Sequence, residues 1–179
     1  PRWWNGRHEG LKSLCPQGRE RSTRSRGTRT MTLPTHALAG LIIGRITGDF
    51  STALIGSLII DADHAISYIR HGMLFTPKKL FRVICDRADP WGDQRSILHS
   101  MFSFITISLF LFLLNAHFAF VFSIAYFFHL VLDALDSSDF YPLFPFRKFV
   151  LKGRTEYHSK QELTLDICLI FIVIGLFIV

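Results

Sequence analysis

Paired cysteines, glycine-rich loops and charged side chains are all scarce in this chain of 179 residues. Its three cysteines, Cys15, Cys85 and Cys168, include no CxxC pair, which argues against a disulfide framework and against a thiolate zinc site. No glycine-rich phosphate-binding loop is present, so we expect no nucleotide cofactor. Only 19% of the residues are charged, whereas 49% are apolar and Phe occurs 18 times. This composition excludes a disordered chain and favours a small integral membrane protein.

The positive net charge does not point to nucleic acid, because all of it lies in one segment. The net charge is +6, and residues 1–30 hold seven Arg, one Lys and two Glu, so the other residues are neutral overall. This segment has no apolar run, which excludes a secretory signal. We expect a basic disordered leader upstream of a true start at Met31, and no nucleic-acid partner. The alternative is a basic arm that binds anionic lipid or nucleic acid.

Five apolar segments after Met31 predict an all-α integral membrane bundle of about four to five helices, in one domain over residues 31–179. Spanning ~30 Å of hydrocarbon takes about 20 residues. By that measure the third and fourth segments span comfortably and the fifth nearly does, whereas the first two are short and form a shallow hairpin. In chain order the predicted helices are Leu33–Ile46, Ser51–His64, Ser96–Leu114, Ala116–Leu135 and Leu163–Val179.

Basic side chains gather in the two predicted polar loops, Ser67–Arg95 and Asp136–Glu162. Of the twelve basic residues after the leader, six lie in the first loop and five in the second, and only Arg45 lies near the opposite turns. Helices that alternate in direction place both loops on one side, and the excess of positive charge predicts that this side is cytoplasmic. The sequence therefore predicts a multi-pass protein of the inner (plasma) membrane.

Ionisable side chains occur at the predicted cytoplasmic ends of four of these helices. Such groups are costly inside a hydrophobic segment and mark functional sites by default. His129 and Asp133 are spaced i and i+4, and Asp61 and His64 i and i+3, so each pair shares a helical face. Imidazole and carboxylate together suit Zn²⁺, with Mn²⁺ as an alternative. We predict one shared metal site whose ligands are His36, Asp61, His64, His99, His129 and Asp133.

Polar side chains continue along two of the predicted helices from these candidate ligands. Because residues three or four positions apart share a helical face, each set forms a stripe that we expect to point into the bundle rather than at lipid. The stripes are Tyr126, His129, Asp133 and Asp136 on one helix, and His99, Ser103 and Thr106 on another.

Simpler interpretations exist for each of these residues taken singly. A lone interfacial His often serves only as a hydrogen-bonding group, an i,i+4 His–Asp pair is a common helix-surface interaction, and Asp61 and Asp63 can simply end a helix. Seven such groups at one membrane face favour a shared site instead. We exclude His117, which lies at the far turn, and keep the loop residues His71 and His158 as additional candidates.

Several motifs occur in order between Met31 and the C-terminus: THALAG, IIDADH, RSILHS, FFHLVLDAL and YPLFP. With them the chain resembles the YdjM family of inner-membrane metal-dependent hydrolases, some of which are named LexA-binding inner membrane proteins. The family's Asp-x-Asp-His and HxxxD motifs carry over to Asp61, Asp63 and His64 and to His129 and Asp133.

Two positions depart from that family's motifs. Ile60 stands where a proline usually precedes the first Asp, and Gln94 stands where a His is common. Gln is a poor zinc ligand, so position 94 either binds no metal or acts only by hydrogen bonding. The family is similar in turn to zinc-dependent phospholipase C and P1-type nucleases, which also use an N-terminal amine as a ligand. Nothing in this chain fills that role, so the resemblance does not carry over a full three-metal cluster.

The preferred hypothesis is a membrane-bound metal-dependent hydrolase that acts at the cytoplasmic leaflet. One or two divalent ions would activate a water for attack on a phosphoryl or carbonyl centre. The resemblance to the phospholipase group implies a phosphoester substrate, with a membrane lipid head group as a candidate. Asp63 ligates, acts as general base or orients a histidine. Arg95 is a candidate phosphate clamp, with snorkelling at the interface as its alternative role.

Two alternative functions belong to other classes. In the first, the metal is structural and the protein is a non-catalytic scaffold whose loops recruit a cytosolic protein partner, as the LexA-binding name within the family suggests. In the second, the ionisable residues mark an ion pathway. Transport predicts such residues across the whole depth of the bilayer. Beyond Asn115 and His117 the apolar segments hold no second cluster, so transport ranks last.

Overall fold

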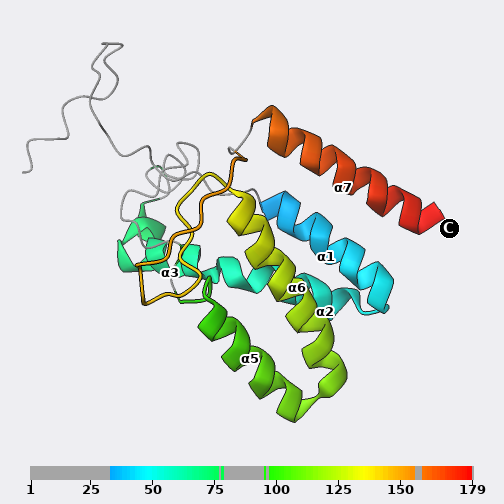
Figure 1. Ribbon diagram of the computed structural model, residues 1–179, viewed down its shortest axis with the longest axis horizontal. Helices are drawn as coiled ribbons and strands as arrows, with labels where there is room; N and C mark the ends of the chain where they lie inside the picture. The colour runs from blue at the N-terminus through cyan, green and yellow to red at the C-terminus, as the bar shows by residue number, and fades with distance from the viewer. Residues whose placement is uncertain (1–32, 77, 79–94, 96, 156–158, 179) are drawn as a thin grey trace, which may run out of the picture.

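The computed structural model describes residues 33–76, 78, 95, 97–155 and 159–178 (Figure 1). Within these ranges the regular structure is helical and contains no strand, which confirms the predicted all-α class. Isolated bridges pair Asp136 with Thr155 and Phe140 with Leu151 in the segment after the fourth predicted helix. The predicted leader, residues 1–30, lies outside the described residues.

The first, fourth and fifth predicted helices are found with ends within three residues of those expected. They correspond to α1, α6 and α7. The elements are α1 (Leu33–Thr47), α2 (Phe50–Leu58), the 3₁₀ turn η1 (Ile59–Asp61), α3 (Ala62–Arg70), the 3₁₀ turn η2 (Met73–Phe75), α5 (Met101–Leu114), α6 (Ala116–Leu135) and α7 (Lys160–Ile178).

The prediction of one continuous helix over Ser51–His64 is wrong. The 3₁₀ turn η1 separates α2 from α3, and its backbone is tightened because the N–H of Ala62 bonds to the carbonyls of Ile59 and Ile60. Ile60 is fully buried there, so tertiary packing holds the turn in place. α3 then continues to Arg70, into the segment predicted as a polar loop.

The third predicted helix begins later than expected. Ser100 has an extended backbone, and its hydroxyl accepts a hydrogen bond from the backbone N–H of Ser103 at 3.2 Å. This N-cap starts α5 at Met101 rather than at Ser96. His99 therefore lies in the chain just before the helix and not on one of its faces.

Capping side chains also set the two turns at the opposite end of the bundle. Asp49 accepts a hydrogen bond from the backbone N–H of Thr52 at 3.0 Å, and hydrogen bonds from the Thr52 hydroxyl and backbone lower the pKa of the Asp49 carboxyl. Asn115 accepts from the N–H of Phe118 at 2.9 Å, which starts α6 directly after α5. The short turns make α1 and α2, and α5 and α6, antiparallel neighbours (Figure 1).

Small residues allow α2 to lie very close to α6 and α1. A Cβ atom on Gly56 would lie 2.7 Å from the carbonyl oxygen of Phe122, and one on Gly40 would lie 2.4 Å from Ser57 Oγ. Ala125 on α6 is fully buried at the same contact. Close backbone approach through small residues is typical of helices that pack within membranes. It places the end of α2 directly against the face of α6 that carries His129.

Two helices of the described structure are long and apolar enough to cross a membrane, α6 with 20 residues and α7 with 19. α5 has only 14 residues, fewer than the roughly 20 that a span requires, so the prediction that this segment spans comfortably is wrong. Large apolar side chains on all three helices remain exposed, among them Phe110, Phe127 and Phe171. Apolar groups thus face outward while ionisable groups lie inside, an arrangement suited to lipid.

Candidate metal centre

Four parts of the chain bring ionisable side chains to one end of the bundle. His36 lies near the start of α1, Asp61 in η1, His99 just before α5 and His129 near the end of α6. Figure 1 shows these ends meeting opposite the turns that join α1 to α2 and α5 to α6. The three histidines are each only 1% exposed. Residues far apart in sequence therefore share one buried site.

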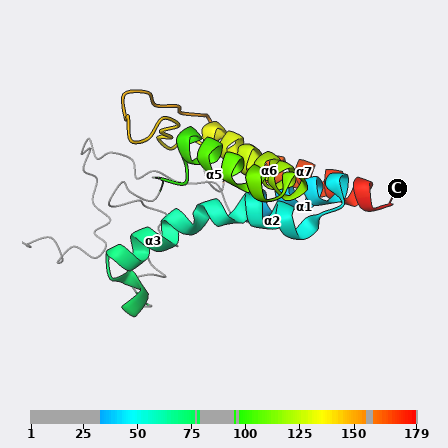
Figure 2. The same cartoon turned by 90° about the horizontal axis from the view of Figure 1, so that it is seen from below.

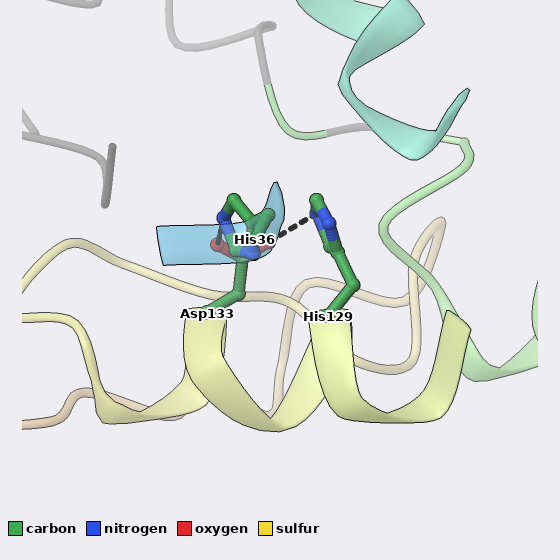
Figure 3. Close-up of side chains that lie close together, drawn as sticks. All are labelled: His36, His129 and Asp133. Atoms are coloured by element: carbon green, nitrogen blue, oxygen red, sulfur yellow. Dashed lines mark ion pairs between the residues drawn. The ribbon is translucent and has the colours of Figure 1, made fainter. Parts of the chain in front are cut away.

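The first group of candidate ligands comprises His36, His129 and Asp133, whose ligand atoms all lie within 4.8 Å of one another (Figure 3). His36 Nε2 lies 3.7 Å from Asp133 Oδ1, and His129 Nε2 lies 3.3 Å from Asp133 Oδ2. The two imidazole rings stack with their centroids 3.8 Å apart. All three side chains are buried, so this group forms the inner part of the site.

The second group comprises Asp61, His64 and His99, again with ligand atoms within 4.8 Å of one another. His64 Nε2 lies 3.5 Å from Asp61 Oδ1, and His99 Nε2 lies 3.9 Å from the same oxygen. The side chains of Asp61 and His64 remain 19% and 17% exposed. This group therefore forms the open side of the site.

The two groups are in direct contact. His99 Nε2 lies 3.3 Å from Asp133 Oδ2, and His129 Nε2 lies 3.8 Å from Asp61 Oδ1. Each carboxylate thus approaches histidines of both groups. We call the six residues together the His–Asp cluster: His36, Asp61, His64, His99, His129 and Asp133.

The hydrogen bonds of two histidines place a proton on the Nδ1 atom of each ring. His129 Nδ1 lies 2.7 Å from the carbonyl oxygen of Ser57, which can only accept, so Nδ1 donates. His99 Nδ1 lies 3.2 Å from Asp63 Oδ2, and an ionised carboxylate likewise only accepts. In the neutral imidazoles both Nε2 atoms then present lone pairs, and these atoms lie 3.4 Å apart. Each Nε2 also lies 3.3 Å from Asp133 Oδ2, so the close approach of the two nitrogens is stable when a metal ion or a proton lies between them and that carboxylate.

These donors fit a divalent metal ion by chemistry and by spacing. Two ligand atoms bound about 2.1 Å from one tetrahedral Zn²⁺ lie roughly 3.4 Å apart, close to the 3.3 Å between Asp133 Oδ2 and each of His99 Nε2 and His129 Nε2. Asp133 Oδ2 and His36 Nδ1 are also buried without a hydrogen-bond partner. Buried polar atoms left unpaired are costly and need a partner. A metal ion would supply one for the carboxylate.

Arg95 occupies a different position from that of a phosphate clamp. The guanidinium Nη2 lies 2.8 Å from both Asp133 Oδ1 and Asp136 Oδ2, and Nη1 donates to Ser138 Oγ. The residue is 8% exposed. The second candidate role, snorkelling, is not what this geometry shows either, because the charged head points inward. Arg95 instead connects the chain before α5 with the end of α6.

Several groups that hold the candidate ligands in place cannot be predicted from helical spacing. The Ser57 carbonyl orients His129, while Asp63 accepts the backbone N–H of Leu98 at 2.8 Å as well as facing His99. The Tyr126 hydroxyl donates to the Leu98 carbonyl, which fixes the same segment from the other side. Tyr126 and Asp136 belong to the predicted stripe on α6, but their partners come from other parts of the chain and no sequence period indicates them.

The remaining predicted residues have mixed outcomes. The stripe on α6 is buried as expected, but Thr106 is exposed, so its predicted inward orientation is wrong. Because α5 begins after His99, that histidine does not share a helical face with Ser103 and Thr106. His117 lies at the far turn, 3.9 Å from Asp49 and largely exposed, and His71 ends α3 outside both ligand groups. Outside the described residues lie His8, Gln94 and His158.

The fold and this site together define a class of small helical membrane protein with a buried histidine–aspartate cluster. The sequence model of one family, described as YdjM inner membrane protein, matches residues 31–178. The chain belongs to the YdjM inner membrane protein family. No curated protein and no solved structure matches it.

Proposed function

We propose that this protein is a membrane-bound metal-dependent hydrolase that acts on a phosphoester through a metal-activated water. The observation that carries the proposal is the pair of buried Nε2 atoms of His99 and His129, 3.4 Å apart and both beside Asp133 Oδ2. The other nitrogen of each ring is engaged by a carbonyl or carboxylate acceptor. This is how ligating histidines are held in metal enzymes.

The residues that would hold Zn²⁺ or Mn²⁺ are those of the His–Asp cluster. A divalent ion bound there supplies Lewis acidity and lowers the pKa of water. Its inner ligands would be His36, His129 and Asp133, while Asp61, His64 and His99 complete the site on the open side. The residual exposure of Asp61 and His64 gives a substrate and water access from that side.

The chain's own residues then have distinct tasks. Asp63 orients His99 rather than offering a free carboxylate, because its Oδ2 already faces the ring and the Leu98 N–H. Arg95 positions Asp133 and balances its charge through the 2.8 Å contact to Oδ1, which leaves Oδ2 directed at the histidines. In this proposal Asp63 and Arg95 are positioning residues. The phosphoester class rests on the resemblance to the phospholipase group.

The experiment is a turnover assay on the purified full chain in lipid vesicles. Protein stripped of metal with a chelator, and then reloaded with Zn²⁺ or Mn²⁺, is tested on an activated phosphodiester, on phospholipids and on nucleotides. We expect hydrolysis that requires reloading, falls by about 10–100-fold or more in Asp61→Asn and is unchanged in His117→Ala. Metal bound by the wild type without turnover of any of these substrates would overturn the hydrolase proposal and favour a scaffold with a structural metal that recruits a cytosolic partner.

A further inference from the structure

α3 takes a different direction from the helices around it. Figure 2 shows it continuing from the end of α2 and turning away from α5 and α6. The helix begins at the His–Asp cluster, because Asp61 and Asp63 flank its first residue. It is therefore an arm that starts at the open side of the site.

The inner side of this arm is polar, and its outer side carries two isoleucines with Arg70 at the end. Asp63 and Ser67, one turn apart, are 3% and 2% exposed, whereas Ile66 and Ile69 are 47% and 55% exposed. Phe75 in η2, shortly after the helix, is 87% exposed. A surface helix of a water-soluble protein shows the opposite pattern, with its apolar stripe against the core. Ile66, Ile69 and Phe75 are thus expected to contact an apolar partner rather than water.

The same inverted pattern occurs on the apolar helices α5 and α7. Phe110 on α5 and Phe171 on α7 are 59% and 68% exposed, and the family is one of inner membrane proteins. α3 has nine residues, about 14 Å of helix, which is too short to cross the hydrocarbon core. A short helix with one apolar side is suited to lie in the interface, and the exposed Arg70 at its end suits the head-group layer.

We propose that α3 and η2 form a membrane-surface arm, in which Ile66, Ile69 and Phe75 insert among phospholipids at the boundary of head groups and acyl chains. The lipid bilayer is the partner of this surface. The arm then holds Asp61 and His64, the open side of the His–Asp cluster, at the level of the head groups. The inference rests on exposure and on membership of a membrane family, and it stands whether or not the site is hydrolytic.

The test uses the full chain in vesicles of phosphatidylcholine and phosphatidylglycerol. A nitroxide is attached to single cysteines placed at Ile66, Ile69 or Phe75, after Cys15, Cys85 and Cys168 are changed to Ser. Phe171→Cys on α7 is the lipid-facing control, and Lys152→Cys, exposed in the segment after α6, is the water-facing control. Accessibility to oxygen, which concentrates in lipid, is compared with accessibility to a water-soluble nickel chelate.

We expect the oxygen-to-nickel ratio at the three arm positions to exceed that at Lys152→Cys severalfold and to approach that at Phe171→Cys. A ratio equal to that at Lys152→Cys would place the arm in water and overturn the proposal. Low accessibility to both reagents would also overturn it, because the arm would then be covered by protein. The labelled positions all carry exposed side chains, so the labels themselves leave the packing of the bundle intact.

Discussion

At the scale of single residues, the charge balance around Arg95 is the feature with the clearest energetic consequence. One buried guanidinium faces two buried carboxylates, those of Asp133 and Asp136, each at 2.8 Å. Removing one member of a buried ion pair costs about 3–5 kcal/mol, because the charge that remains has lost its water and also its partner. The structure therefore ties the stability of the bundle to the same carboxylate that lines the His–Asp cluster.

We predict that Arg95→Gln lowers the free energy of unfolding by about 3–5 kcal/mol, measured as a fall in melting temperature in detergent micelles. Asp136→Asn added to Arg95→Gln should recover part of the loss, since it removes one uncompensated charge. Lys152→Gln is the control, because Lys152 pairs with Asp139 at 3.1 Å in an exposed position and should cost less than about 1 kcal/mol. Equal losses from the two single substitutions would contradict the role assigned to Arg95.

Helical spacing and the cost of buried charge suffice to select the candidate ligands at this scale, and the structure brings these six residues together. They do not reveal what holds the ligands. Arg95 meets Asp133 and Asp136 across 38 and 41 residues, and the Ser57 carbonyl reaches His129 across 72. Such contacts follow from the packing of whole helices. The extended backbone at Ser100 and the buried 3₁₀ turn η1 change which residues meet, but neither is visible in the hydrophobic pattern of the sequence.

At the scale of elements, the contact between α2 and α6 positions the site. Gly56 leaves no room for a side chain, since a Cβ atom there would lie 2.7 Å from the Phe122 carbonyl oxygen and 3.0 Å from the Ala125 Cβ. The next residue, Ser57, carries the carbonyl that orients His129. Separation of the two helices would therefore move the histidine out of place.

We predict that Gly56→Ala destabilises the protein by about 1–3 kcal/mol through overpacking and also weakens metal binding. Gly175→Ala is the matched control, because nothing lies within 4 Å of the added Cβ and alanine favours a helix over glycine by about 1 kcal/mol. Thermal unfolding and metal titration of the two variants make the comparison. A Gly56→Ala variant as stable as Gly175→Ala would show that α2 and α6 are not packed this closely.

The accuracy of the helix predictions varies in a physically consistent way. α1, α6 and α7 are long apolar runs with clear ends, and the sequence locates them well. The break at η1 is not visible in the sequence, because Ile59 and Ile60 continue the apolar run of the preceding helix. The turn depends instead on the burial of Ile60. The extent of α5 depends on the cap at Ser100, which competes with an apolar run that begins earlier.

At the scale of the whole molecule, the distribution of basic residues predicts which end of the bundle faces the cytoplasm, and this orientation can be tested. The His–Asp cluster and the segment containing Lys152 lie at one end, and the turns at Asp49 and Asn115 lie at the other. We predict that a cysteine at Lys152 reacts with an impermeant maleimide only after the cells are opened. A cysteine at His117, which is exposed at the far turn, should react in intact cells. The reverse pattern would contradict a cytoplasmic site.

The central claim is that side chains from separate helices form one metal site, and the metal content of purified variants tests it most directly. The wild type should hold at least one Zn²⁺ or Mn²⁺ per chain after loading and desalting. His36→Ala and His129→Ala, from α1 and α6, should each lower the affinity by at least about 100-fold, whereas His117→Ala should keep the wild-type content. Undiminished metal in both His129→Ala and Asp133→Ala, or a wild type that binds none, would contradict the account.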